Sequence, residues 1–350
     1  MSYNQQFDAL KQQSQVKPLS RRDFVRVLSV AAAAGPGMAA AGLSGFALTK
    51  SQRVEAAEVV VAGLGKLPKV PYGKTGFKVT PLCICQDWRN SEVIAAALAM
   101  DVNFIHKAGY WGGRGGPVPD EIAKLPRESY YTDITVDNTS PGQNPDNYDQ
   151  AYGQVSTSLE KNGLKYYDVY RAHYGWHTPE ALNKGMNTSY KAFQQLKKEG
   201  KVRHFGVSQH PYVDGSNDER REKYAIMTQA LIDSGVIESM QVWFAYGYPK
   251  EVMDVFAKAS EAGIAMTAMK VNAHGRGKLQ GDPAKMAELK AADKAGRAAI
   301  RWVLEQKRSD GKPIFQTCVS NIQSMEVFDE NVGGVSPKVA AVDGWTLPWA

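Results

Sequence analysis

The chain has 350 residues, of which 43% are hydrophobic and 22% are charged, a balance typical of a folded protein with one large α/β domain or two ordinary domains. Its net charge of +6 comes mostly from residues 1–57, because the rest of the chain carries 35 basic and 33 acidic residues. The near balance over the folded part argues against nucleic-acid binding.

Residues 1–57 resemble an export signal. Arg21 and Arg22 precede a long run rich in Ala and Gly, and small residues follow near its end. The paired arginines resemble the twin-arginine signal, which implies export of the folded protein to the periplasm by the twin-arginine machinery. The Gly-Pro-Gly sequence at 35–37 disfavours a helix of the mature fold. Retention of the leader as an uncleaved membrane anchor is the alternative to its cleavage. We expect a signal peptide over 1–57 and the folded domain over 58–350.

Alternating strands and helices are expected after a short hairpin over residues 70–79 that turns at Lys74-Thr75-Gly76. The predicted strands are 82–85, 102–106, 130–136, 166–173, 203–208, 238–244, 264–270 and 314–319. The predicted helices are 91–100, 118–125, 147–162, 179–199, 218–235, 250–262, 284–307 and 321–331. Eight strand–helix repeats in about 270 residues favour a closed (β/α)8 TIM barrel over an open doubly wound sheet.

Several residues indicate where the predicted helices begin and end. Asn90, Pro179 and the pair Ser320-Asn321 suit helix starts, and Gly163 and Gly200 suit the left-handed turn that ends a helix.

The three cysteines, Cys83, Cys85 and Cys318, do not make a disulfide framework. Residues i and i+2 of a strand lie about 7 Å apart, so Cys83 and Cys85 are poorly placed to pair with each other. Either could meet Cys318 if the first and last strands are neighbours, as in a closed barrel. Buried free thiols are the alternative.

Six short motifs occur in sequence between residues 73 and 322. They are Gly73–Leu82, Asp101–Ala108, Leu164–His173, Gly200–Ser208, Gln241-Val242 and Ser320-Asn321-Ile322. Together they resemble the aldo/keto reductase family over residues 70–332. The resemblance implies a TIM barrel, NADP as hydride carrier, and reduction of an aldehyde or ketone group of a small-molecule substrate.

The same resemblance places the family's four catalytic positions. The family uses a tyrosine as proton donor, a lysine and an aspartate that lower its pKa, and a histidine that orients the carbonyl. By position the histidine is His173, whereas the aspartate is replaced by His106, the lysine by Thr135 and the tyrosine by Trp111, which follows Tyr110. An indole N–H cannot serve as a general acid. We therefore assign carbonyl orientation to His173 and proton transfer to Tyr110 or His106.

The cofactor positions are also altered. Ser208 and Gln241 stand where the family holds the nicotinamide amide, and Met269 replaces the stacking tyrosine. No basic residue precedes Ser320 for a ribose phosphate, so NADP binding stays open. Lys270 either replaces the missing lysine or forms a solvent-exposed rim charge. The candidate cofactor residues are Ser208, Gln209, Gln241, Lys270, Ser320 and Asn321.

Five of the six histidines fall at the carboxyl ends of predicted strands or in the loops after them, with Cys85 and Asp137. Such side chains can bind a transition metal or haem, although a barrel mouth collects polar residues in any case. Three hypotheses follow: an exported aldo/keto reductase-like oxidoreductase with a remodelled site, a non-catalytic barrel that serves as partner or binding subunit of a periplasmic redox complex, and a metal- or haem-binding variant.

Overall fold

The computed structural model describes most of the chain beyond the predicted leader. The described residues are 54, 61, 64–85, 90–107, 109, 115–136, 147–174, 179–211, 216–244, 246–271, 284, 295–320, 322, 324–339, 345 and 348. The expected signal peptide lies outside them, except for Val54. Among the described helices, none has the length and apolar character needed to cross a lipid bilayer.

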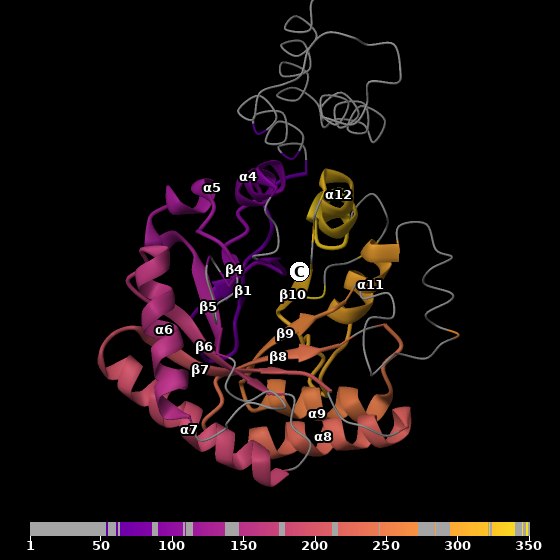
Figure 1. The fold of residues 1–350 in the computed structure, drawn as a ribbon. Helices are drawn as coiled ribbons and strands as arrows, with labels where there is room; N and C mark the ends of the chain where they lie inside the picture. Colours follow the sequence, from indigo (N-terminus) through magenta and orange to yellow (C-terminus); the bar gives the residue numbers. More distant parts are fainter. Residues whose placement is uncertain are drawn as a thin grey trace, which may run out of the picture.

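Eight parallel strands form a closed barrel (Figure 1). They are β3 (Leu82–Cys85), β4 (Phe104–His106), β5 (Tyr131–Val136), β6 (Tyr167–Tyr174), β7 (Val202–Gln209), β8 (Ser239–Trp243), β9 (Ala265–Met269) and β10 (Thr317–Ser320). The barrel closes because the last strand, β10, pairs in parallel with the first, β3. Both faces of these strands are covered, which explains why most of their residues are buried. The predicted (β/α)8 fold is confirmed.

Helices surround the strands (Figure 1). They are α4 (Ser91–Ala99), α5 (Asp120–Ala123), α6 (Tyr148–Asn162), α7 (Pro179–Lys198), α8 (Asn217–Asp233), α9 (Lys250–Glu261), α11 (Ala295–Leu304) and α12 (Met325–Gly333), with a 3-10 turn at Arg127–Ser129. Helix α12 contacts α4, so the ring of helices closes where the ring of strands does.

The ends of these helices mostly follow the predicted capping residues. Asn90 accepts a hydrogen bond from the backbone N–H of Glu92 at the start of α4, and Gly163 ends α6 with a left-handed φ of 64°. The predicted start of the last helix at Ser320-Asn321 is wrong. Ser320 instead extends strand β10, where it pairs with Ile84, and Ser324 caps α12.

The hairpin of β1 (Val70–Pro71) and β2 (Lys78–Val79) covers the amino-terminal end of the barrel, which we call the base. Between its strands, the Tyr72 hydroxyl reaches the interior and lies 2.9 Å from the Ser239 hydroxyl of β8. Gly73 has a φ of +52°, and a Cβ at this position would lie 2.5 Å from the backbone nitrogen of Ala265. The tight contact between the hairpin and the base therefore requires glycine at this position.

Cys83, Cys85 and Cys318 form no disulfide in the described part of the chain. Strands β3 and β10 are neighbours, but Cys318 is in register with Leu82 rather than with Cys83. Successive side chains of a strand point to opposite faces, so Cys318 and Cys83 lie on opposite sides of the sheet. Burial raises the pKa of both thiols, which makes them unreactive.

Candidate functional site

The carboxyl ends of the strands form the opposite end of the barrel, which we call the mouth. Parallel neighbours pair His106 with Asp133, His173 with Ser208, and Ser208 with Gln241. Residues paired in register project to the same face of a sheet. The barrel therefore brings four of the predicted site residues, His106, His173, Ser208 and Gln241, to one end of its interior.

The most ordered part of the mouth is a pair formed by His106 and Asp133. Nδ1 of His106 lies 2.8 Å from Oδ1 of Asp133 and 3.0 Å from Oδ2. The backbone N–H of Lys107 also donates to Oδ1, at 2.8 Å. Nε of Arg171 donates to Oδ2 at 2.5 Å. The carboxylate is thus held by three donors and cannot rotate freely.

This bonding pattern assigns the tautomer of His106. An ionised carboxylate only accepts hydrogen bonds, so Nδ1 of His106 carries the hydrogen and Nε2 keeps a lone pair. Nε2 lies 3.3 Å from Nε2 of Gln241, whose N–H donates to it. The same amide nitrogen contacts the sulfur of Met269 at 3.5 Å. His106 thus presents a basic nitrogen toward the middle of the mouth.

The charges around the pair keep the histidine neutral and the aspartate ionised. Burial lowers the pKa of His106 below its ordinary 6.5, and the charges of Lys107 and Arg171 add to this, although Asp133 opposes it. Burial alone would raise the pKa of Asp133, but the charge of Arg171 and the hydrogen bonds from His106 and Arg171 hold it well below its usual range. The site therefore contains a carboxylate beside a neutral imidazole.

A second cluster of rings stands beside the first. The ring centroids of His173 and His210 are 4.6 Å apart, and His210 meets Trp243 edge-on at 5.6 Å. Nζ of Lys270 lies 6.0 Å from the centre of the Trp243 ring. Burial lowers the pKa of His210 well below its ordinary value, with further lowering by His173, Lys107 and Lys270.

The mouth is electropositive as well as aromatic. Lys107 and Lys270 directly follow β4 and β9, with left-handed φ values of 54° and 62°. Residues other than glycine adopt this backbone conformation at a cost of about 1–3 kcal/mol, and such strained residues cluster at functional sites. Asp133 is the acidic residue among the described mouth residues discussed above, and its charge is balanced by Arg171. An anionic ligand would be attracted to this end of the barrel.

The other predicted site residues have different surroundings. Gln209 ends β7 next to Ser208, but its side-chain oxygen accepts a hydrogen bond from Thr228 of helix α8, at 3.0 Å. Ser320 is buried at the end of β10. Tyr110 and Asn321 lie outside the described residues, as does Trp111.

The metal-binding alternative gains no support. No group of three or more His, Cys, Asp or Glu side chains able to hold a metal ion occurs within the described parts of the chain. Asp137, His177 and His274, which contributed to that hypothesis, lie outside those parts. His204 stands apart at the base, where its Nδ1 lies 2.9 Å from Oε1 of Glu238.

Sequence reasoning missed Asp133, Arg171 and Tyr72. Asp133 lies in strand β5 between Thr132 and Ile134, and Arg171 lies in strand β6 between Tyr170 and Ala172; neither side chain is exposed by more than 1%. A charged residue in the middle of a strand buried on both faces was the available signal, because such a residue requires a partner.

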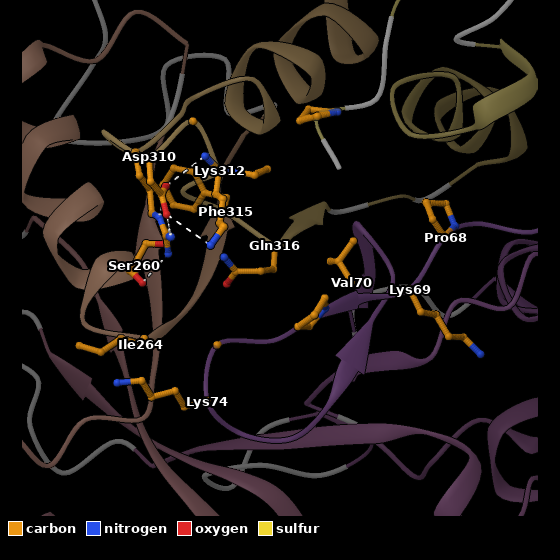
Figure 2. Close-up of a pocket in the computed structure, with 17 residues that line it drawn as sticks. Pro68, Lys69, Val70, Lys74, Ser260, Ile264, Asp310, Lys312, Phe315 and Gln316 are labelled. Carbon is orange, nitrogen blue, oxygen red and sulfur yellow. Dashed lines mark hydrogen bonds and ion pairs between the residues drawn. The ribbon is translucent and has the colours of Figure 1, made fainter. Parts of the chain in front are cut away.

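A groove of about 780 Å³ lies at the base of the barrel (Figure 2). Ile264 and Phe315, which precede β9 and β10, line it together with hairpin residues. Nε of Arg308 donates to Asp310 at 2.9 Å, and Nζ of Lys312 lies 3.5 Å from the same carboxylate. None of the predicted catalytic or cofactor residues lines this groove.

The aldo/keto reductase family model matches residues 89–324. A protein of Mycolicibacterium smegmatis described as an aldo-keto reductase is 27% identical over 184 residues, which is 52% of this chain. The chain spans 58% of the length of that relative.

Solved structures of aldo-keto reductases share the fold. AKR11C1 from Bacillus halodurans in its holo form has 16% sequence identity and a TM-score of 0.54, covering 77% of this chain and 90% of that chain. An enzyme from Brucella melitensis has 20% identity and a TM-score of 0.50, covering 79% and 98%. The chain belongs to the aldo/keto reductase family.

Proposed function

We propose that this chain is an exported oxidoreductase that interconverts a carbonyl group and an alcohol, with His106 as the proton-transferring group. The observation that carries the proposal is the pair of His106 and Asp133 at the mouth, in which the lone pair of the imidazole lies on Nε2 and accepts a hydrogen bond from Gln241. In the family pattern, the position of His106 holds an aspartate and the proton donor is a tyrosine. The histidine–aspartate pair supplies the missing acid–base function within the same part of the barrel.

Proton transfer follows from the ionisation of the pair. A neutral imidazole accepts the hydroxyl proton of an alcohol at Nε2, while Asp133 accepts the hydrogen bond from Nδ1–H and stabilises the resulting positive charge. In the reverse direction, protonated His106 gives this proton to the carbonyl oxygen as hydride reaches the carbon. Because burial lowers the pKa of His106, carbonyl reduction should speed up as pH falls, and alcohol oxidation should be favoured near neutral pH.

The residues at the mouth fit a nicotinamide nucleotide, which when bound supplies or accepts the hydride. Oε1 of Gln241 is a buried acceptor with no partner among the described residues, and the buried Ser208 stands beside it in register. These two groups can hold a carboxamide, and the cations Lys107 and Lys270 suit phosphate groups. The family generally uses NADP(H).

His173 completes the proposed site. It is the last inward-facing residue of strand β6, at the mouth, and is in register with Ser208. We assign it the role of orienting the substrate oxygen by hydrogen bonding. Tyr110 remains a second candidate for proton transfer, because it lies a few residues beyond His106 in the sequence.

The export proposal depends on the leader. The twin-arginine motif supports transport of the folded protein to the periplasm, where a redox partner protein could supply or remove reducing equivalents. A non-catalytic partner subunit is the competing proposal. It would need neither nucleotide binding nor a proton-transferring histidine.

Binding and turnover of NADPH test the proposed function. We expect saturable binding of NADPH in calorimetry, oxidation of NADPH with para-nitrobenzaldehyde as probe, and weaker binding in Gln241→Leu. His204→Gln is the matched control, because His204 lies at the base. Absence of NADPH binding to the purified chain would contradict the enzyme proposal and leave the partner-subunit role.

A further inference from the structure

A chain of hydrogen bonds runs through the barrel interior from the base to the mouth. At the base, the Tyr72 hydroxyl lies 2.9 Å from Oγ of Ser239 and 2.5 Å from Oγ1 of Thr267. The same hydroxyl accepts a hydrogen bond from Nη2 of Arg171 at 2.9 Å. Nε of Arg171 donates to Oδ2 of Asp133 at 2.5 Å. Asp133 in turn holds His106.

The residues of this series of hydrogen bonds are buried, so each depends on its partner for hydrogen bonding. Arg171 is the largest of the fully buried side chains, and Tyr72 is also fully buried. A guanidinium and a carboxylate buried together depend on each other, because either one alone would be an uncompensated charge in a medium of low dielectric. Arg171 therefore has no alternative solvent-facing position, and its orientation depends on Tyr72 at one end and Asp133 at the other.

The arginine also favours the neutral form of His106 in the histidine–aspartate pair, in addition to burial and the charge of Lys107. With Arg171 present, the pair of Asp133 and neutral His106 balances the guanidinium charge. Without a buried cation, a protonated His106 would become the natural partner of the carboxylate. Arg171 thus selects the neutral imidazole, and Asp133 directs the hydrogen of that imidazole to Nδ1.

We infer that Arg171 and Tyr72 are positioning residues, which hold the ring and the Nδ1–H tautomer of His106 through Asp133 and link them to the hairpin at the base. The catalytic consequence rests on the proposed function; the effect on His106 does not. Titratable or charged groups reach His106 from five strands or the segments that follow them: Cys83 and Cys85 from β3, Lys107 after β4, Asp133 from β5, Arg171 from β6 and His210 after β7.

The test is nitrogen-15 NMR of histidine-labelled protein in the full chain, with the His106 signals assigned by their loss in His106→Gln. In the native protein we expect a single Nδ1–H tautomer that remains neutral below pH 6.5, the ordinary pKa. Arg171→Met should give a His106 that is protonated on both nitrogens near neutral pH. Arg171→Lys keeps a cation and should restore the neutral form.

Tyr72→Phe removes one hydroxyl, keeps every charge and is expected to fold. It should give a second tautomer population or exchange-broadened His106 signals. Tyr167→Phe is the matched control, because it removes another buried hydroxyl, which bonds to Ser158 outside this chain of contacts. Arg127→Met is the control for the arginine, since Arg127 pairs with the buried Asp168.

The outcomes separate cleanly. The inference would be overturned if His106 showed the same tautomer and the same titration in Arg171→Met and Tyr72→Phe as in the native protein and the control variants. A response to Arg171→Met alone would overturn the link to Tyr72 and the hairpin. If His106 responds as expected but no variant or native protein turns over NADPH, the positioning role stands and the proposed function fails.

Discussion

Nδ1 of His106 lies 2.8 Å from Oδ1 of Asp133, and this contact joins two neighbouring strands at the mouth of the barrel. Arg171 and the backbone N–H of Lys107 hold the same carboxylate. The aspartate is therefore a fixed acceptor, and the imidazole is a base whose lone pair lies on Nε2, facing Gln241.

Replacing Asp133 with asparagine should impair catalysis. An amide at this position can donate to Nδ1 of His106 and so favour the wrong tautomer. We expect kcat for carbonyl reduction to fall by about 10²–10⁴-fold, with a smaller change in KM. Asp254→Asn is the control, because Asp254 forms an exposed ion pair with Lys250 on helix α9. A native kcat in Asp133→Asn would contradict the assigned role.

Removing the buried arginine should destabilise the fold. Arg171→Met removes the guanidinium from the buried pair with Asp133, and breaking such a pair costs about 3–5 kcal/mol in the free energy of unfolding. Urea denaturation measures the change. Arg221→Met breaks a surface ion pair with Asp218 and should cost less than about 1 kcal/mol. Equal effects of the two substitutions would show that Arg171 is not held as described.

Acid should weaken the fold through the two buried histidines. The pKa of His106 and that of His210 are both lowered in the folded protein. The unfolded chain therefore binds protons first as pH falls below 6.5, and each histidine removes up to about 1.4 kcal/mol of stability per pH unit. Above that pH the contribution is fully present. Urea denaturation between neutral and mildly acidic pH measures it.

A variant isolates this effect from other titrating groups. His210→Asn should have a shallower dependence of unfolding free energy on pH over this range than the native chain. Parallel curves for the two proteins would contradict a neutral, buried His210.

The contact between the hairpin and the barrel can be tested by substitution of Gly73. Gly73→Ala introduces a Cβ that would lie 2.5 Å from the backbone nitrogen of Ala265, at a φ of +52°. Gly163→Ala has a similar φ of +64° but nothing within 4 Å, so it tests backbone strain alone, about 1 kcal/mol. We expect Gly73→Ala to lower the melting temperature clearly more than Gly163→Ala. Equal losses would argue against a tight contact between hairpin and barrel.

The sequence predicted most of the fold, because its signals are local. Alternating apolar segments and capping residues such as Asn90 and Gly163 placed the elements to within about two residues in most cases, as expected where the pattern is strong. The error at Ser320 arose because a serine can cap a helix or end a strand, and pairing with Ile84 decided between these.

Only part of the candidate site could be predicted from the sequence. His106, His173, Ser208 and Gln241 were identified by position in the motifs. Asp133 and Tyr72 were not, because their contacts join residues 27 and 99 positions apart. Such contacts depend on the register of the closed barrel, which short motifs do not specify.

The most direct test of the central claim is the pH dependence of NADPH-dependent reduction of para-nitrobenzaldehyde in the native chain, His106→Gln and His204→Gln. We predict that the native rate rises as pH falls toward the pKa of His106. We expect His106→Gln to lower kcat by about 10²–10⁴-fold and to abolish this pH dependence, and His204→Gln to behave as the native chain. A His106→Gln variant with native rates and a native pH profile would contradict proton transfer by His106.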